Sequence, residues 1–212
     1  MTQDLILQQV ENYVKNRLSN ESSGHDYWHV ARVVNNAKKL LQKEKADELK
    51  VLLAAWLHDV GDYKIHGGVD KTEEIVLPLL RSLGFKEGFS REILKIISET
   101  GYRGGHNIFP HSIESQIVQD ADRLDAMGAV GIARAFATGA ARGSEIFNPK
   151  DKPKEYADFE AYKNSKSSTI VHFYEKLLKL KDLMNTPTAK KMAETRHNFM
   201  LKFLEEFYEE VN

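Results

Sequence analysis

The stretch from Ala46 to Val60 constrains the fold most, because it reads as a helix that is apolar on most of its sides. Its centre, VLLAAWL, offers no polar face that could meet solvent. A helix of this kind is stable only when other elements cover it on several sides, so it belongs in the middle of a core. The rest of the chain must therefore supply the covering elements.

Amphipathic helices are the covering elements that the remaining sequence predicts. Over residues 26–43, apolar side chains from Val30 to Leu41 recur at the i, i+3, i+4, i+7 spacing of one helix face. Further helices are predicted over residues 3–19, 71–83, 90–100, 112–127 and 129–141, and two more from about residue 166, separated at 185–187. No alternation typical of strands occurs, so we expect an all-α helical bundle with a C-terminal helical hairpin.

The order of these elements suggests one domain with an appendage. The 212 residues suffice for a single sizeable core. We expect a helical core over residues 1–142 and a hairpin over 166–212 that packs on it. Residues 143–165 contain two of the five prolines and show no clear periodicity, so they predict a loop or flap.

Charge and composition exclude several classes of function. Lys and Arg number 30 and Asp and Glu 31, so the net charge of −1 gives no global attraction to nucleic acid or to an anionic membrane. The absence of cysteine excludes disulfides, thiolate nucleophiles and cysteine-based zinc sites. The first residues carry charges and no long apolar run, so we expect no signal peptide or membrane span there and a cytoplasmic location.

Histidine is the residue type that points toward chemistry. Six of the eight histidines fall between His25 and His111. In a chain without cysteine, such enrichment favours a metal site built from nitrogen and oxygen ligands. The alternative is that several of these histidines are surface or capping residues.

His58 and Asp59 adjoin each other at the end of the apolar helix. A charged carboxylate in so apolar a context is costly unless it is paired or ligated, and the exposed carbonyls of a helix end favour a nearby cation. The pair could instead simply cap the helix. His29 lies at the edge of the packed face of the preceding helix, where it could equally be a hydrogen-bonded core histidine.

A third acidic segment interrupts the apolar pattern of the helix predicted over 112–127. Asp120 and Asp122 lie about 200° apart on a helix, so they are not expected to bind one ion together. Asp122 shares a side with Asp125, whereas Asp120 points elsewhere and could orient a ligand histidine. Ion pairs on the helix surface are the alternative role for all three.

Taken jointly, His29 in HDYWHVARV, His58 and Asp59 in AAWLHDVGDYK, and Asp122 in VQDADRLDA resemble the HD superfamily of metal-dependent phosphohydrolases. The resemblance covers about residues 20–142 and implies a helical bundle in which these four side chains bind a divalent metal. It also favours Asp122 over Asp120 as the last ligand, with Asp120 and Asp125 as supporting carboxylates.

A set of two imidazoles and two carboxylates leaves positions of a six-coordinate ion open for water and a phosphate oxygen. Histidine ligands favour Mn²⁺, with Co²⁺, Mg²⁺, Ni²⁺, Fe²⁺ or Zn²⁺ as alternatives. Because HD hydrolases often place an acid near the site, the resemblance assigns Asp62 as general acid or base. The alternative is a loop aspartate bonded to its own backbone.

Positive charge is needed to offset the charge of a phosphoryl transition state. Lys64, in the loop of Asp62, and Arg103, in the second glycine-rich loop, are the preferred phosphate contacts, although either could be a solvated surface residue. His25 and Tyr27 are further substrate-binding candidates. The extra loop histidines His66, His106 and His111 could serve a second metal or proton transfer, and Tyr27, Trp28 and Tyr63 could stack on a base or belong to the core.

The subgroup that the chain resembles cleaves nucleoside triphosphates, deoxy forms included, to monophosphate and pyrophosphate, and we expect this pyrophosphohydrolase reaction here. Alternatives are a 5′-nucleotidase-type phosphomonoesterase, a di-iron HD oxygenase, and a regulatory module that binds nucleotide without turnover. The expected partners are a phosphorylated small molecule, in particular a nucleotide, and a second copy in a homodimer, with neither nucleic acid nor membrane.

Overall fold

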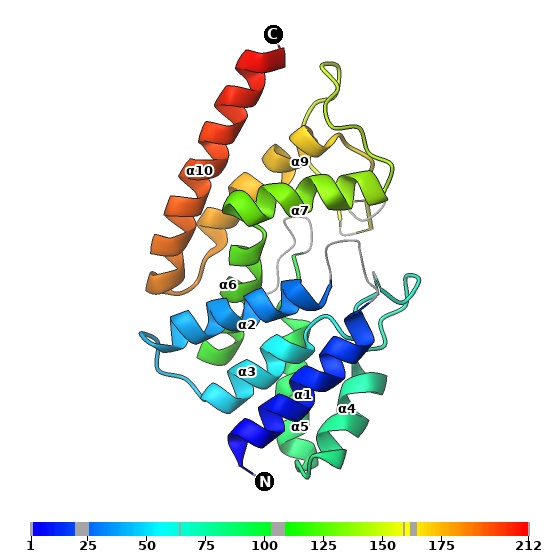
Figure 1. Ribbon diagram of the computed structural model, residues 1–212, viewed down its shortest axis with the longest axis vertical. Helices are drawn as coiled ribbons and strands as arrows, with labels where there is room; N and C mark the ends of the chain where they lie inside the picture. The colour runs from blue at the N-terminus through cyan, green and yellow to red at the C-terminus, as the bar shows by residue number, and fades with distance from the viewer. Residues whose placement is uncertain are drawn as a thin grey trace. The chain divides into compact units, whose positions relative to one another are not determined.

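The computed structural model describes residues 2–19, 26–63, 65–102, 109–158, 160–161 and 165–211. Over these residues the chain is helical and contains no strand, as the sequence predicts (Figure 1). None of the helices in these ranges has both the length and the apolar character that crossing a membrane requires. The chain divides into two compact units. Unit 1 comprises Met1–Gly101 and Phe109–Asp122, and unit 2 comprises Tyr102–Ile108 and Arg123–Asn212.

Unit 1 is built around the helix predicted to be central. Its elements are α1 (Gln3–Leu18), α2 (Tyr27–Leu41), α3 (Glu48–Leu57), α4 (Thr72–Ser82), α5 (Glu87–Ser98) and most of α6 (Ile113–Asp125). Every residue of α3 from Val51 to Leu57 is buried, and α1, α2 and α5 pack against it. The prediction from the apolar VLLAAWL run is therefore confirmed.

The boundaries of α3 differ from the predicted range of 46–60. The side chain of Asp47 accepts a hydrogen bond from the backbone N–H of Lys50 and so caps the start of the helix. The helix ends at Leu57, which leaves His58 as the C-cap and Asp59 in the turn beyond. The helix is therefore shorter than predicted, but His58 and Asp59 still lie at the end of a buried helix, as the sequence predicts.

Gly61 follows this turn, and close packing explains why it is glycine. Gly61 is not among the glycines with positive φ, so its backbone conformation does not require glycine. A Cβ atom at Gly61 would lie 2.3 Å from the Cα of Thr72 at the start of α4. The Gly61 carbonyl also accepts a 2.8 Å hydrogen bond from the backbone N–H of Lys71. The turn that carries Asp59 is therefore held directly against the start of α4.

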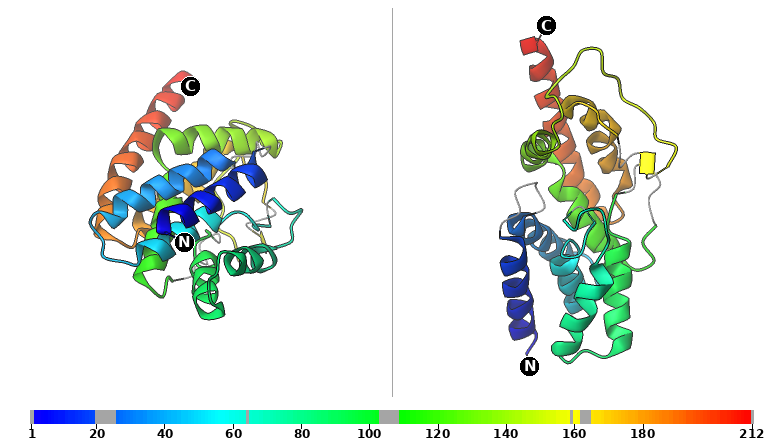
Figure 2. Two further views of the ribbon diagram at one scale, coloured as in Figure 1. Left: turned by 60° about the horizontal axis from the view of Figure 1, so that its bottom comes forward. Right: turned by 90° about the vertical axis from the view of Figure 1, so that its right-hand side faces the viewer.

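Unit 2 contains the end of α6, α7 (Gly128–Ala141), α9 (Thr169–Glu175), the 3₁₀ helix η1 (Leu177–Leu183) and α10 (Pro187–Val211). Two helices were predicted from about residue 166, whereas the structure interposes η1 between α9 and α10. Helix α10 packs against α7 and η1, which Figure 2 shows from two directions. Phenylalanine side chains form the contact between α7 and α10. The ring centroids of Phe136 in α7 and Phe203 in α10 lie 6.0 Å apart.

Residues 143–158, the first part of the predicted loop or flap, are tied to the start and end of α9. The backbone N–H of Ser168 donates to Asp151 at 2.7 Å. Glu175, only 3% exposed, accepts hydrogen bonds from the backbone N–H of Lys154 at 3.1 Å and from the hydroxyl of Ser167 at 2.7 Å. A buried carboxylate therefore anchors this segment within unit 2.

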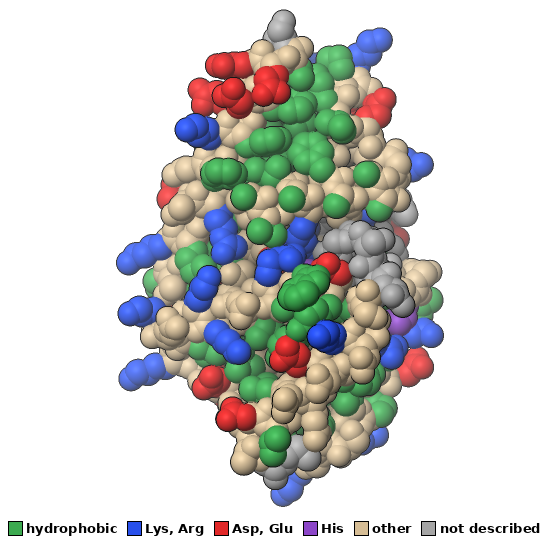
Figure 3. Space-filling view, viewed as in Figure 1, with side chains coloured by type: hydrophobic (Ala, Val, Ile, Leu, Met, Phe, Trp, Pro, Cys, Tyr) green, Lys and Arg blue, Asp and Glu red, His purple; other side chains and the backbone are tan. Residues whose placement is uncertain are grey.

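Apolar side chains also reach the surface of unit 2. Figure 3 shows hydrophobic side chains gathered around α7 and the C-terminal half of α10. Among the apolar residues of unit 2, Val130 of α7 and Phe199 of α10 are exposed. The homodimer predicted from sequence stays a prediction.

Candidate metal centre

Three segments of unit 1 bring the predicted ligands together. His29 lies in the first turn of α2, where the side chain of Asp26 caps the helix by accepting a 2.8 Å hydrogen bond from the His29 backbone N–H. His58 and Asp59 follow α3, and Asp122 lies near the end of α6. Residues distant in sequence thus meet because α2, α3 and α6 converge at these ends.

The donor atoms of the four side chains lie within a few ångströms of one another. His29 Nε2 is 3.3 Å from His58 Nε2, 3.3 Å from Asp59 Oδ2 and 3.5 Å from Asp122 Oδ1. His58 Nε2 is 3.5 Å from Asp59 Oδ1 and 3.9 Å from Asp122 Oδ1. Ligand bonds of ~2.1 Å at right angles would place neighbouring donor atoms about 3 Å apart, so the cluster has the dimensions of a metal site.

Burial and donor chemistry also fit a divalent cation. His29, His58 and Asp59 are buried, and one ligand atom from each lies within 4.8 Å of the others. A buried carboxylate is stabilised by a cation, and mixed imidazole and carboxylate donors suit transition-metal ions. The side chain of Asp122 is 25% exposed, which makes it the accessible member of the set.

Backbone contacts hold the ring of His58 in a state suitable for binding metal. His58 Nδ1 lies 2.9 Å from the carbonyl oxygen of Ala55. A carbonyl can only accept, so Nδ1 carries a proton, which leaves Nε2 as the nitrogen that can offer a lone pair to a metal. This Nε2 is the atom that faces His29 and Asp122.

Asn36 links two of the ligand-bearing helices. Its Nδ2 donates a 3.1 Å hydrogen bond to the carbonyl oxygen of Ala121, the residue before Asp122. Sequence reasoning did not single out Asn36. The available signal was its position two turns after His29 on α2, where a polar residue interrupts the apolar face.

The two predicted supporting carboxylates have different surroundings. Asp120 is fully buried within unit 1. Asp125 belongs to unit 2, where its Oδ2 lies 2.9 Å from Arg134 Nη1 in a largely buried ion pair. The support of metal ligands by either residue stays a prediction.

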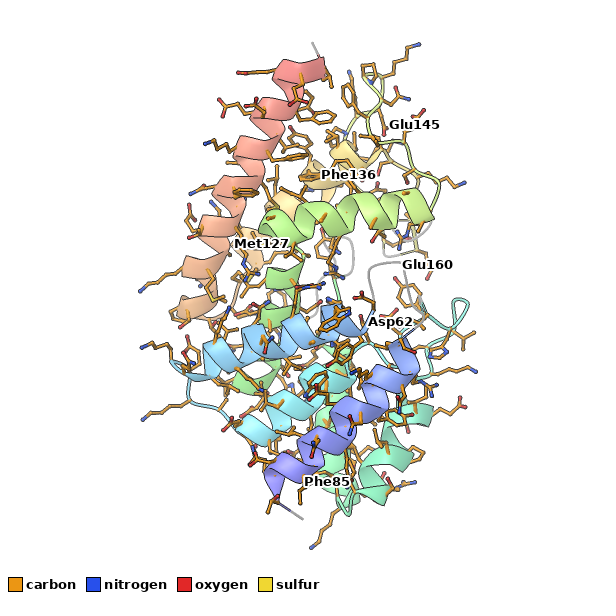
Figure 4. All side chains as sticks on the ribbon, viewed as in Figure 1. Asp62, Phe85, Met127, Phe136, Glu145 and Glu160 are labelled. Atoms are coloured by element: carbon orange, nitrogen blue, oxygen red, sulfur yellow. The ribbon has the colours of Figure 1, made fainter. Side chains whose placement is uncertain are left out.

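Asp62 lies in the loop after α3, where Figure 4 labels it. Its backbone N–H donates a 3.2 Å hydrogen bond to the carbonyl oxygen of Asp59. This contact keeps the proposed acid or base one turn from a proposed ligand, and the side chain is only partly buried. The predicted phosphate and substrate contacts Lys64, Arg103 and His25, together with His106, lie outside the described residues.

Tyr27 and Trp28, which the sequence offers as aromatic rings that could stack on a base, occupy different environments. The hydroxyl of Tyr27 donates to Glu11 at 2.8 Å, and its ring stacks on Trp56 with centroids 6.2 Å apart. Burial, together with the carboxylate of Glu11, raises the pKa of Tyr27 to about 12. Trp28 is 64% exposed. Of the two rings, that of Trp28 is therefore the more accessible to a ligand.

The remaining loop histidines in the described ranges hold local structure. His66 Nε2 lies 3.0 Å from the carbonyl oxygen of Val60. His111 Nδ1 lies 2.6 Å from the buried carboxylate of Glu99. Although burial raises the pKa of Glu99, hydrogen bonds from His111 and Ser115 hold it below its ordinary value. Neither histidine is among the residues grouped with His29, His58 and Asp59 over the part of the chain that the structure describes.

Known proteins resemble this chain in sequence and in fold. The HD domain family model matches residues 27–127. The uncharacterized protein YpgQ of Bacillus subtilis is 40% identical over 206 residues, which cover 96% of this chain and 93% of YpgQ. A crystal structure of YpgQ in complex with ADP has a TM-score of 0.77 at 35% identity and covers 97% of each chain.

Two further crystal structures are similar over nearly the whole chain. A protein from Lactobacillus plantarum has a TM-score of 0.87 at 35% identity, covering 99% of this chain and 98% of its own. An HD-superfamily hydrolase from Bacillus thuringiensis has a TM-score of 0.77 at 38% identity, covering 100% of this chain and 99% of its own. With these relatives, the family-model match and the His-His-Asp group of the metal centre, the chain belongs to the HD superfamily of hydrolases.

Proposed function

We propose that this protein is a divalent-metal-dependent nucleotide pyrophosphohydrolase, which hydrolyses ribo- or deoxyribonucleoside triphosphates to monophosphate and pyrophosphate. The observation that carries the proposal is the cluster of His29, His58, Asp59 and Asp122, in which each histidine Nε2 lies 3.3 to 3.9 Å from donor atoms of the other side chains. The nucleotide part is supported by the complex of the related YpgQ with ADP.

Charge explains why such a site would need its ion before it could accept a polyphosphate. Without a cation, Asp59 and Asp122 carry two negative charges, which repel an anionic substrate. A divalent ion with two neutral imidazoles and two carboxylates has a net charge near zero, so this repulsion disappears. We therefore expect the metal to support substrate binding as well as turnover, with Mn²⁺ favoured by the imidazole ligands.

The chemistry divides between the ion and the side chains around it. A bound divalent cation makes water a better nucleophile and polarises a phosphoryl oxygen. His29 and His58 hold fixed positions, since Asp26 caps the helix of the first and Ala55 accepts the Nδ1–H of the second. Asp62 would accept the proton of the attacking water and return it to the leaving group.

Basic residues would complete the phosphate site. We assign Lys64 and Arg103 to the phosphate oxygens, where their positive charge offsets the charge that develops in the transition state. Lys64 immediately follows Tyr63 in the loop of Asp62. His25 would make a further polar contact with the substrate, and Tyr27 would act by supporting its neighbour Trp28.

A product-resolved assay tests the proposal. The protein is stripped with chelator, reloaded with Mn²⁺, Co²⁺ or Mg²⁺, and incubated with ribo- and deoxyribonucleoside triphosphates. Monophosphate is measured by chromatography, and phosphate is measured with and without added pyrophosphatase. We expect equal amounts of monophosphate and pyrophosphate, and little activity in Asp59→Asn, which removes one ligand charge at nearly constant shape. The exposed Asp182→Asn in η1 is the matched control and should remain active.

The alternative functions would give different results. Release of phosphate from monophosphates alone would indicate a phosphomonoesterase. Tight nucleotide binding without any product, across all the metals, would indicate a regulatory module. A dinuclear iron centre in metal analysis and absorption spectra would indicate an oxygenase.

A further inference from the structure

The two tryptophans of the chain occupy opposite environments. Trp56 of α3 is 6% exposed, whereas Trp28, in the first turn of α2, is 64% exposed. Large aromatic side chains are highly buried on average, and exposed apolar area often marks a place where a ligand or partner binds. Trp28 therefore needs an explanation beyond packing within the chain.

Neighbouring aromatic rings support the exposed indole of Trp28. The ring of Tyr27 contacts Trp28 edge-on, with centroids 5.1 Å apart and planes inclined at 65°. Tyr27 in turn stacks on the buried Trp56 and donates its hydroxyl to Glu11. A continuous aromatic path thus runs from the core to the surface. Such a pre-organised ring loses little conformational freedom when a ligand stacks on it.

The position of Trp28 relates it to the metal centre. Trp28 directly precedes His29, and the capping bond from the His29 backbone N–H to Asp26 fixes the backbone of both residues. A helix advances about 100° per residue, so Arg32 lies ~40° from Trp28 and ~60° from His29 around α2. One flank of α2 therefore carries an imidazole, a guanidinium and an exposed indole in succession.

This succession matches the chemistry of a nucleotide. Its phosphates need the cation and positive charge, and its base needs a flat apolar surface. We infer that Trp28 is the platform on which the base of the substrate stacks. The inference rests on the proposed nucleotide function and adds a residue that would bind the nucleoside half.

Stacking would also set the substrate range. Every base has a π-face, so a stacking platform tolerates all of them and reads no hydrogen-bond pattern. Trp28 would therefore strengthen binding of purine and pyrimidine nucleotides over base-free polyphosphates without selecting one base. From the usual effect of replacing a stacking aromatic by alanine, affinity should fall about 5- to 150-fold.

Binding measurements on Trp28 variants test the inference without turnover. In isothermal titration with Mg²⁺ present, Trp28→Ala should weaken ADP binding by this factor and leave pyrophosphate binding unchanged, because pyrophosphate has no base. Trp28→Phe should keep most of the ADP affinity. In steady-state assays Trp28→Ala should raise KM and preserve kcat, as expected for loss of uniform binding.

Fluorescence provides a direct signal, since the chain contains only two tryptophans. In Trp56→Phe, Trp28 is the sole reporter, and ADP should quench its emission whereas pyrophosphate should not. In Trp28→Phe the buried Trp56 should not respond to ADP. Unchanged Mn²⁺ affinity in Trp28→Ala would separate stacking from any effect on the neighbouring His29.

Several results would overturn the inference. Equal ADP affinity and KM in wild type and Trp28→Ala, with wild-type turnover intact, would remove the role of Trp28 and leave the proposed function standing. An equal loss of ADP and pyrophosphate binding, or a loss of Mn²⁺ affinity, would show that Trp28 acts through the start of α2. A wild-type protein that neither binds ADP nor cleaves any nucleotide would overturn both the inference and the proposed function.

Discussion

His172 in α9 leads to a prediction for stability in mild acid. Burial, followed by the positive charges of Lys176 and Arg142, lowers the pKa of His172 from 6.5 to about 3. Between these two values the unfolded chain binds a proton that the native chain does not. The contribution of neutral His172 to the free energy of unfolding is therefore complete above pH 6.5 and is lost as the pH falls below that value.

The size of the loss follows from the unfolded pKa. Each pH unit below the unfolded pKa of 6.5 lowers the free energy of unfolding by about 1.36 kcal/mol. Because pH 5 lies about one and a half units below 6.5, the free energy of unfolding should decrease by about 2 kcal/mol between pH 8 and pH 5. Any native pKa of His172 below ~4 gives the same figure at pH 5, since the native ring remains neutral there.

Urea unfolding at pH 8 and pH 5, in chelator, measures this quantity. Other groups titrate in every variant, so the informative number is the difference between wild type and His172→Asn. The variant should lose about 2 kcal/mol less than wild type over this interval. Lys176→Gln removes a neighbouring charge but not the burial, so it should behave like wild type. Equal losses in wild type and His172→Asn would refute the reasoning.

Three further substitutions test contacts that hold the site and the segment after α7. Gly61→Ala introduces a methyl group against the backbone at the start of α4, and thermal melting should reveal a loss of about 1–3 kcal/mol; an unchanged melting temperature would contradict the close approach. Asn36→Ala removes the bond to the Ala121 carbonyl and should cost about 1–3 kcal/mol and weaken Mn²⁺ binding in calorimetry; full Mn²⁺ affinity would deny it a positioning role. Glu175→Gln weakens the anchor of residues 143–158, so limited proteolysis should cleave there faster than in wild type; equal cleavage rates would show that the carboxylate is dispensable.

Much of unit 1 could be predicted from sequence because its signals are local. The apolar run in α3 has no face for solvent, and a His-Asp pair that contains a carboxylate has few stable roles at the end of such a helix. Helix periodicity then placed Asp122 on a different side from Asp120. These arguments need only the geometry of a helix and the cost of burying charge. The choice of Asp122 over Asp120 as a ligand came from the resemblance to the HD superfamily.

Contacts between distant segments explain what could not be predicted. Tyr27 and Trp28 are adjacent aromatics, and only the packing of Tyr27 on Trp56 decides which ring is exposed. The engagement of Asp125 with Arg134 likewise depends on how α7 follows α6. Where a helix ends also depends on the elements that pack against it, so the sequence predicts one helix where the structure has α9 followed by η1.

The spacing of the proposed ligands along the chain has a consequence for folding. His29 and His58 are 29 residues apart, and the bond that joins α2 to α6 spans 85 residues. An unfolded chain cannot hold these groups together without a large loss of entropy, so its metal affinity should be that of scattered side chains. Metal affinity would then return only when the longest loops of unit 1 have closed. During refolding, the ion would report the last long-range step rather than the first helices.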